Sequence, residues 1–219
     1  MSLLCRGTDD SSEKRVRDMG SPSQQQPGQN RSFLLMVYAA IFAAITFAVF
    51  TFLSIPIPTP GAGKVTVHLG NAFCVLGALV LGTAYGSVGG ALGMTIADLA
   101  DPIYIVQAPI TFLIKLAMGV IVGLIAHRAG RITHEQDTKK VLKWVTLASA
   151  AGLVFNAVCD PVIRYFYKIL ILGKPAAEVS FAINIGVAAI NSVVSLLVVV
   201  NLYMAVRTTL KKMNAFFYF

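Results

Sequence analysis

Polar and charged side chains recur at helical spacing inside three apolar stretches of this chain. They are Gln107, Thr111 and Lys115 in the first stretch, Asn156, Asp160 and Arg164 in the second, and Asn184, Asn191 and Ser195 in the third. A spacing of four residues, as in the first two sets, places side chains on one face of a helix. Amide, hydroxyl, ammonium and carboxylate groups together donate and accept hydrogen bonds. Because hydrocarbon penalises such groups, we interpret them as the lining of a site for a small polar ligand.

Two aspartates, Asp98 and Asp101, close a further apolar stretch just before Pro102. Because a proline cannot continue a helix, we expect Asp101 to end the helix in water. Asp98 lies one turn deeper and is expected to face Lys115 or the ligand. The predicted substrate-binding residues are Asn71, Asp98, Tyr104, Gln107, Thr111, Lys115, Asn156, Asp160 and Asn184.

Structural roles remain open for several of these residues. Lys115 can equally pair with Asp160 or Asp98 only to tie helices together. Arg164 is expected to extend outward to water along its apolar stem rather than to contact ligand. Interhelical hydrogen bonds are expected for Asn191 and Ser195.

No motif of an enzyme or of a metal site accompanies these residues. The three cysteines, Cys5, Cys74 and Cys159, lack metal-ligand or redox spacing. The sequence has no nucleophile beside a base and no phosphate-binding glycine loop. We therefore expect no catalytic residues, no bound metal and no enzymatic activity, with Cys74 and Cys159 serving as small packing residues.

The composition predicts an all-α membrane protein. Of the 219 residues, 56% are hydrophobic and 13% are charged, whereas soluble domains carry roughly 25% charged residues. Six transmembrane helices are predicted at about 32–53, 69–84, 85–99, 107–126, 141–167 and 181–206. Glycines at intervals of four in the third helix are expected to let helices approach closely. The predicted domains are a disordered cytoplasmic tail at 1–31, a six-helix transmembrane substrate-binding domain at 32–207, and a cytoplasmic tail at 208–219.

Basic residues set the predicted orientation. They gather in the loop between the fourth and fifth helices and in both tails, so we place these segments in the cytoplasm, with both termini inside. The net charge of +8 therefore indicates no nucleic-acid partner. With this orientation nearly all the polar groups lie in the outer half of the membrane. We expect a cavity that opens to the outside rather than a continuous channel.

The order of sequence blocks resembles a known family. The blocks are "SIPIPTP", "HLGNAF", "LGTAYGSVGGALGMTIADLADP" and "QAPITFLIKLAMGVIVGLIAHR", and the most specific elements are "HLGNA" and "ADLADP…KLAMG". Together they resemble the substrate-binding S components of energy-coupling factor (ECF) vitamin transporters, in the branch for riboflavin, hydroxymethylpyrimidine or pyridoxine. The resemblance covers about 32–206.

The resemblance implies a multi-pass protein of a prokaryotic plasma membrane. S components bind a vitamin near the outer surface, under a lid formed by the loop after the first helix. They bind no cofactor of their own and dock in the lipid bilayer on a transmembrane coupling subunit. Two cytoplasmic ATPases that use ATP drive this coupling subunit. Small residues on the first helix make the docking face in this family. Here "YAAIFAAITFA" offers Ala39 with Ala43 and Ala40 with Ala44.

The polar residues favour a pyridine- or pyrimidine-like vitamin or precursor, and a flavin is possible. A first alternative is a self-sufficient, proton-coupled secondary transporter, with Asp98, Asp101 or Asp160 as proton relay. It predicts polar groups that continue to the cytoplasmic side and an internal repeat, and neither is evident in the sequence. A second alternative is a purely structural or assembly protein, against which the clustering of polar groups argues.

Overall fold

The computed structural model describes residues 27–59, 63–171, 173 and 177–212. The chain divides into two compact units, Met1–Leu34 and Leu35–Phe219, and the second contains the features described below. The predicted tail at 1–31 lies mostly outside the described residues, and so does the part of the predicted C-terminal tail beyond 212. The first part of that tail is helical, because the last helix continues to Lys212.

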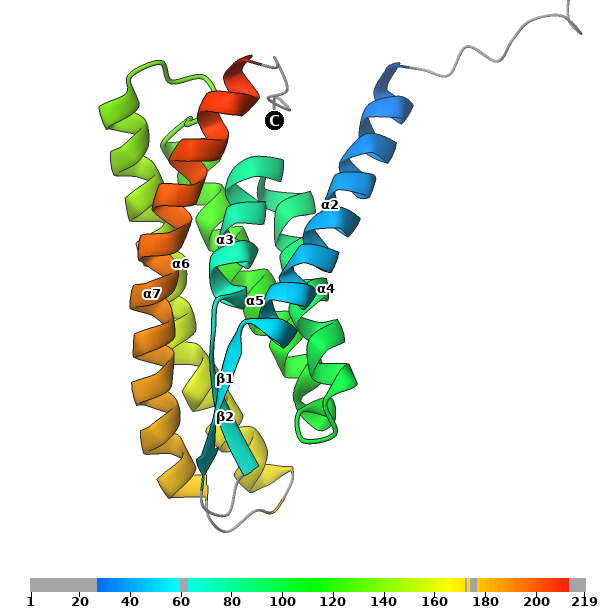
Figure 1. Cartoon of the computed structure of the whole chain (residues 1–219), viewed down its shortest axis with the longest axis vertical. Helices are drawn as coiled ribbons and strands as arrows, with labels where there is room; N and C mark the ends of the chain where they lie inside the picture. The colour runs from blue at the N-terminus through cyan, green and yellow to red at the C-terminus, as the bar shows by residue number, and fades with distance from the viewer. Residues whose placement is uncertain (1–26, 60–62, 172, 174–176, 213–219) are drawn as a thin grey trace, which may run out of the picture. The chain divides into compact units, whose positions relative to one another are not determined.

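The described residues form six α-helices (Figure 1). They are α2 (Pro27–Phe52), α3 (Gly70–Leu81), α4 (Thr83–Ala100), α5 (Ala108–Gly123), α6 (Thr138–Leu170) and α7 (Ala177–Lys212). A 3₁₀ turn, Ile105–Gln107, precedes α5, and a π-helical turn, Leu124–Ala129, follows it. The prediction of six helices is therefore confirmed in number, although not every one of them is long enough to be a candidate membrane span. Gly82, with φ of 83°, separates α3 from α4 in a backbone conformation that favours glycine.

A β-hairpin follows α2, where the sequence had been interpreted as a loop. Its strands, β1 (Ser54–Thr59) and β2 (Gly63–His68), are antiparallel, with Ile55 opposite Val67 and Ile57 opposite Val65. The all-α class holds for the helices, and this two-stranded hairpin is an addition that was not predicted. Alternating β-branched residues favour strands, and the prolines of β1 are tolerated because a two-stranded sheet has only edge strands.

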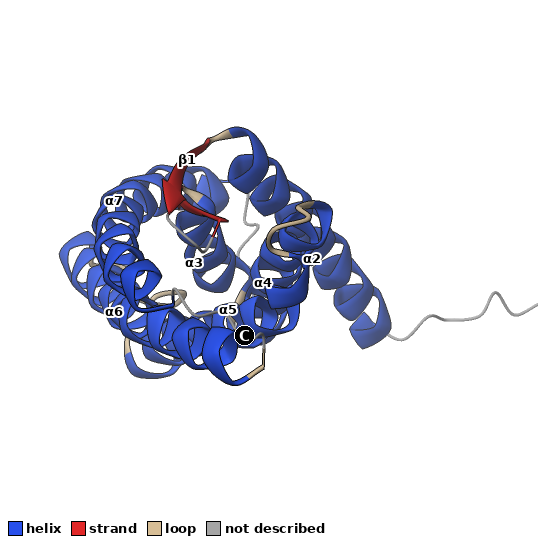
Figure 2. Cartoon of the chain, turned by 90° about the horizontal axis from the view of Figure 1, so that it is seen from below, coloured by secondary structure: helices blue, strands red, loops and turns tan. Residues whose placement is uncertain are grey.

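Helix α3 lies among the other helices of the second unit (Figure 2). It packs against α4, α5 and α7, while α4 also packs on α5, and α6 packs on α7. Residues such as Val75, Ala78 and Leu79 of α3 are fully buried. With 12 residues, α3 reaches only about 18 Å, which is shorter than the ~30 Å of a hydrocarbon core. It is therefore a core helix rather than a full span.

Four helical segments are long and apolar enough to cross a membrane. They are Arg31–Phe52, Ile105–Ala129, Thr138–Leu170 and Phe181–Thr209. Large apolar side chains on these helices point away from the protein: Leu113, Val154 and Leu197 are each more than 60% exposed. In water such surfaces are a liability, but in a bilayer they face lipid.

Helix α2 packs against α4 through glycines. A Cβ atom at Gly89 would lie 2.7 Å from the Ala39 carbonyl oxygen, and one at Gly93 would collide with the backbone of Ala43. Both alanines are consequently buried. The prediction that Ala39 and Ala43 form a docking face is corrected, because they already contact α4. Ala40 and Ala44, on the other side of α2, are exposed.

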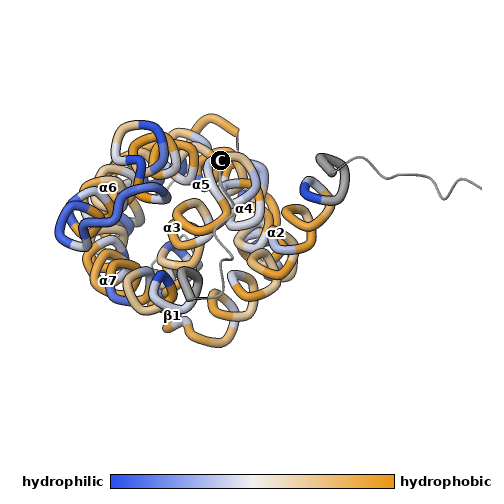
Figure 3. The backbone as a smooth tube through the Cα atoms, turned by 90° about the horizontal axis from the view of Figure 1, so that it is seen from above, coloured by the Kyte–Doolittle hydropathy of each residue, from blue (hydrophilic) through white to orange (hydrophobic). Residues whose placement is uncertain are grey.

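The two ends of the second unit differ chemically. The hairpin lies at one end, and the segment between α5 and α6 lies at the other, beside the end of α7 (Figure 1). The guanidinium of Arg207 on α7 donates a 2.6 Å hydrogen bond to the Glu135 carbonyl oxygen of that segment. Hydrophilic residues mark the same end in Figure 3. The hairpin and the basic segment are therefore separated by the length of the helices.

A candidate site for a small polar ligand

A cavity lies between the helices at the hairpin end of the second unit. The nine residues predicted to bind substrate, from Asn71 to Asn184, all line it. Its empty volume, counted together with the open solvent at its edge, is about 650 Å³. The residues come from α3, α4, α5, α6 and α7 and from the turn before α5. Spacing along α5 and α6 thus identified their inward faces correctly, and tertiary packing brought the nine residues to one place.

Lys115 of α5 lies at the centre of the polar groups. Its ammonium donates hydrogen bonds to Asn71 Oδ1 of α3 at 2.9 Å and to Asn156 Oδ1 of α6 at 2.6 Å. Asp160 Oδ1 lies 3.8 Å from the same nitrogen, which is too far for a hydrogen bond. The Lys115 side chain is 3% exposed, so these groups hold a buried charge in a fixed position.

Arg164 turns into the cavity wall instead of outward to water, contrary to prediction. Its Nε donates to Asp160 Oδ2 at 3.0 Å, one nitrogen donates to Gln107 Oε1 at 2.9 Å, and another donates to Thr111 Oγ1 at 2.7 Å. A guanidinium presents its donors in a planar fork, and three acceptors lie within its reach. The Arg164 side chain is only 13% exposed.

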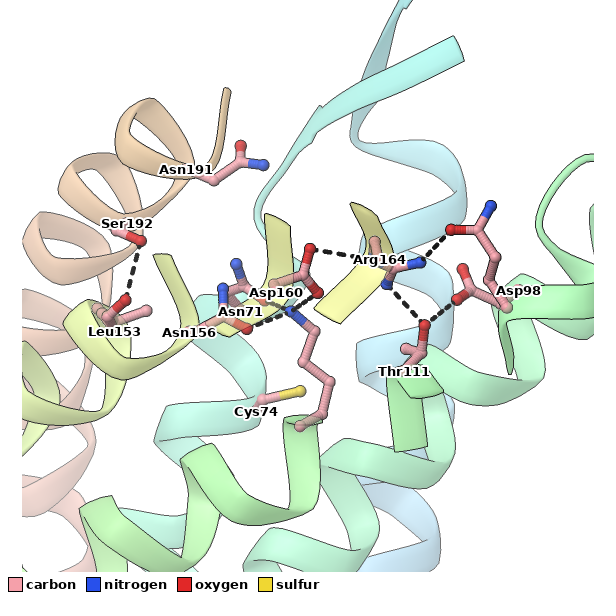
Figure 4. A network of polar contacts seen from close by, with 12 residues as sticks. Asn71, Cys74, Asp98, Thr111, Leu153, Asn156, Asp160, Arg164, Asn191 and Ser192 are labelled. Atoms are coloured by element: carbon pink, nitrogen blue, oxygen red, sulfur yellow. Dashed lines mark hydrogen bonds and ion pairs between the residues drawn. The ribbon is translucent and has the colours of Figure 1, made fainter. Parts of the chain in front are cut away.

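Asp98 joins this network through Thr111. The Thr111 hydroxyl accepts from Arg164 and donates to Asp98 Oδ2, so it links the guanidinium to the carboxylate. Figure 4 shows Asp98, Thr111 and Arg164 turned toward one another. Asp98 was expected to face Lys115 or the ligand. It lines the cavity and is 3% exposed, and its hydrogen bond is to Thr111.

The hairpin covers one side of the cavity and is tied to the end of α4. Asp101, the residue after α4, forms a 2.6 Å ion pair with Lys64 of β2. Tyr104 donates a 2.5 Å hydrogen bond to the Lys64 carbonyl oxygen, and its hydroxyl lies 3.2 Å from Thr66 Oγ1. The prediction that the helix ends at Asp101 is confirmed. Burial would raise the pKa of Asp101, but hydrogen bonds from Lys64 and from the Ile103 N–H hold this pKa below its ordinary value.

Asn191 of α7 ties the hairpin to the opposite side. Its amide nitrogen donates to the Thr66 carbonyl oxygen at 3.1 Å, and its Oδ1 accepts from the His68 N–H at 3.0 Å. It therefore supplies a donor and an acceptor to the backbone of β2. We had predicted an interhelical hydrogen bond for Asn191, and its partner is instead the hairpin.

Sequence reasoning missed several residues that line the cavity. The residues not singled out are Phe50, Lys64, Thr66, His68, Met94 and Lys168, whereas Arg164 and Asn191 were singled out but assigned other roles. His68 packs edge-on against the Phe50 ring, with centroids 4.6 Å apart. Burial, and secondarily the charge of Lys115, lowers the pKa of His68 to about 3, so the imidazole is neutral at physiological pH. The alternation in "KVTVH" was the available signal for the hairpin residues.

The interior changes character away from the hairpin. The buried core there is mostly aliphatic and includes Val122, Ala126, Val141, Val145 and Val199. Cys74 belongs to this packed interior and donates to the Gly90 carbonyl oxygen, which confirms its packing role. In the part of the chain that the structure describes, no three His, Cys, Asp or Glu residues come together as a possible metal site.

One comparison with known proteins finds a relationship. The model of a family described as the ECF-type riboflavin transporter, S component, matches residues 30–208. No curated protein and no solved structure matches the chain significantly. The matched range contains every residue that lines the cavity, and it extends over most of the six helices.

Proposed function

The chain belongs to the family of ECF-type riboflavin transporter S components, and on this premise we propose what it captures and how it is used. It is a multi-pass membrane protein and a substrate-binding transport subunit, not an enzyme. Its ligand is a small vitamin or vitamin precursor, with a pyridoxine- or pyrimidine-like compound favoured and riboflavin as the alternative. It captures this ligand at the outer face of the membrane and docks on a transmembrane coupling subunit. Two cytoplasmic ATPases drive release inside.

The convergence of polar side chains on one cavity carries this proposal. Amides from Asn71 and Asn156 bind the Lys115 ammonium, and the Gln107 amide binds the guanidinium of Arg164 beside Asp160. This set offers both donors and acceptors at fixed positions, which suits a heterocycle with ring nitrogens and hydroxyl groups.

The position of the cavity supports a capture role. It lies at the hairpin end, where residues of β2 line it, and the aliphatic core lies between it and the basic end. By the positive-inside rule, the basic end belongs in the cytoplasm, so the cavity would face outward. A proton-coupled transporter would require polar groups that continue toward the cytoplasm. The aliphatic core therefore favours the binding subunit over that alternative.

The test is a titration of the purified full-length protein in detergent, without ATP, against riboflavin, pyridoxine and hydroxymethylpyrimidine. We expect one of them to bind with one-to-one stoichiometry in calorimetry and to raise the unfolding temperature. Absence of binding by all three would overturn the proposal.

Uptake by cells separates the binding subunit from a transporter that acts alone. Cells that express the chain together with a coupling subunit and both ATPases should accumulate the vitamin that binds. Cells that express the chain alone should not. Uptake by the chain alone that collapses with the proton gradient would instead establish the secondary transporter.

A further inference from the structure

We propose that the ligand places a hydrogen-bonding group of dual character between Lys115 and Asp160, accepting from the ammonium and donating to the carboxylate. The inference rests on the proposed function and specifies its ligand. Its starting point is the distance of 3.8 Å between Lys115 Nζ and Asp160 Oδ1. This separation is too long for a direct hydrogen bond and short enough for one polar atom to reach both.

Each of the two atoms has unused hydrogen-bonding capacity. A lysine ammonium has three N–H donors, and Asn71 and Asn156 take two of those of Lys115. Arg164 binds Asp160 Oδ2, whereas Asp160 Oδ1 is buried and has no hydrogen-bond partner among the described residues. A donor and an acceptor therefore face each other across the gap, and both residues line the cavity.

Buried polar groups without partners are costly, and the cost is larger for charged groups. The neighbouring side chains cannot close this gap by a small shift. Lys115 is held by amides from two other helices, and Asp160 is held by Arg164, which is itself fixed by Gln107 and Thr111. The missing partner must come from outside the protein.

The geometry restricts what that partner is. If a ligand oxygen lies about 2.8 Å from both atoms, the angle at that oxygen between Lys115 Nζ and Asp160 Oδ1 is roughly 85°. The hydroxyl of an alcohol or phenol fits this position, because one of its lone pairs can accept from Lys115 and its hydrogen can be donated to Asp160. The adjacent carbonyl and N–H of a lactam ring offer the same two functions. A carboxylate oxygen is only an acceptor and would repel Asp160. A quaternary ring nitrogen offers neither function. The site therefore selects neutral hydroxyl or lactam heterocycles.

The test uses whichever of the three vitamins binds, together with an analogue that lacks one candidate group. The pairs are riboflavin with 3-methylriboflavin and with lumiflavin, which lacks the ribityl hydroxyls, pyridoxine with its three monodeoxy analogues, and hydroxymethylpyrimidine with 4-amino-2,5-dimethylpyrimidine. For the wild-type protein, one analogue should bind about 10- to 100-fold more weakly than its parent, because a hydrogen bond to a charged group is lost. Equal binding of every analogue would overturn the inference, since a water molecule would then suffice in the gap.

Substitutions of Lys115 and Asp160 test whether the hydrogen bonds that the analogue lacks are made with these two residues. In Lys115→Met, the difference in affinity between the parent and the weakened analogue should be smaller than in the wild-type protein, because the group then keeps only its hydrogen bond to Asp160. Lys140→Met is the matched control, since Lys140 forms an exposed ion pair with Glu135 away from the cavity, and there the full difference should persist. An undiminished difference in Lys115→Met would overturn the assignment.

A second variant protects the test against loss of folding. Asp160→Asn is nearly isosteric and should also reduce the difference between parent and analogue. If neither variant binds the parent vitamin, the comparison of parent and analogues on the wild-type protein tests the inference by itself. Failure of the proposed function has a different signature, because then no parent vitamin binds the wild-type protein at all.

Discussion

At the scale of single residues, Arg164 determines how the site is held together. It connects Asp160 on its own helix with Gln107 and Thr111 on the neighbouring segment. Helical spacing shows which residues share a face with Arg164, but it does not show where the Arg164 side chain points. The side chain can turn inward or outward from the same position on the helix. The inward rotamer satisfies three buried acceptors, and this outweighs access to water.

Replacing Arg164 with Met should destabilise the protein by roughly 3 kcal/mol, because it leaves the Asp160 carboxylate without the guanidinium that is hydrogen-bonded to it. The measurement is chemical or thermal unfolding of the purified protein in detergent. Arg128→Met is the control, since Arg128 is exposed, and it should change stability little. Equal effects of the two substitutions would contradict the structural role of Arg164.

At the scale of elements, the hairpin β1–β2 converts a set of helices into a covered site. Lys64, Thr66 and His68 come from alternate positions of β2, which point to one face of the strand. They line the cavity that α3–α7 provide. Two side chains, Tyr104 and Asn191, bond to the backbone of β2 from different elements. The hairpin is therefore attached by a few identifiable contacts.

Lys64→Met and Asp101→Asn should each speed dissociation of the bound vitamin a few-fold, because they loosen the hairpin at the mouth of the cavity. The effect is modest, since the ion pair is partly exposed. Dissociation rates of single and double variants are the measurement. The double variant should match the single ones, because both remove the same contact. Additive effects would contradict this coupling. Lys140→Met, in a loose ion pair at the other end, is the control.

The same ion pair gives a defined pH dependence. The pKa of Asp101 is lowered in the folded protein, so its contribution to stability is complete above the ordinary aspartate pKa of about 3.9. It is lost as the pH falls through the lowered pKa. Dissociation of riboflavin, which does not titrate near this range, should therefore be constant from about pH 8 to 5. In stronger acid, vitamin dissociation from the wild-type protein should become faster, and this increase in rate should be absent in Asp101→Asn.

At the scale of the whole molecule, the second unit has an apolar surface suited to lipid and a polar cavity at one end. The helices present large exposed side chains such as Leu113 and Leu197 outward. Helix α2 contributes both an inner and an outer face. Ala39 and Ala43 meet the glycines of α4, and Ala40 and Ala44 remain exposed. We therefore propose the outer alanines as the docking contact for the coupling subunit.

The two alanine faces predict opposite results for the same substitution. Ala44→Leu should leave vitamin binding and stability unchanged and should impair co-purification with the coupling subunit. Ala43→Leu should destabilise the isolated protein by about 1–3 kcal/mol, because the larger side chain collides with Gly93. The readouts are calorimetry, unfolding in detergent and co-purification. Normal assembly of Ala44→Leu would rule out this docking face.

Much of the architecture is encoded locally. Long apolar runs determined the helices, because each must satisfy its own backbone hydrogen bonds in a bilayer. Four-residue spacing determined which side chains of α5 and α6 share a face. The nine predicted site residues therefore line one cavity even though they come from five helices and a turn.

Other features depend on distances between segments that are remote in sequence. The hairpin forms because β1 and β2 pair with each other and are held by Tyr104 and Asn191. Burial of Ala43 rather than Ala44 depends on where α4 lies. The 3.8 Å gap between Lys115 and Asp160 exists because three helices fix the two side chains independently. Sequence periodicity thus determined which residues face inward, and only the tertiary structure decided which atoms meet, since hydrogen bonds depend on ångström-scale positions that periodicity does not encode.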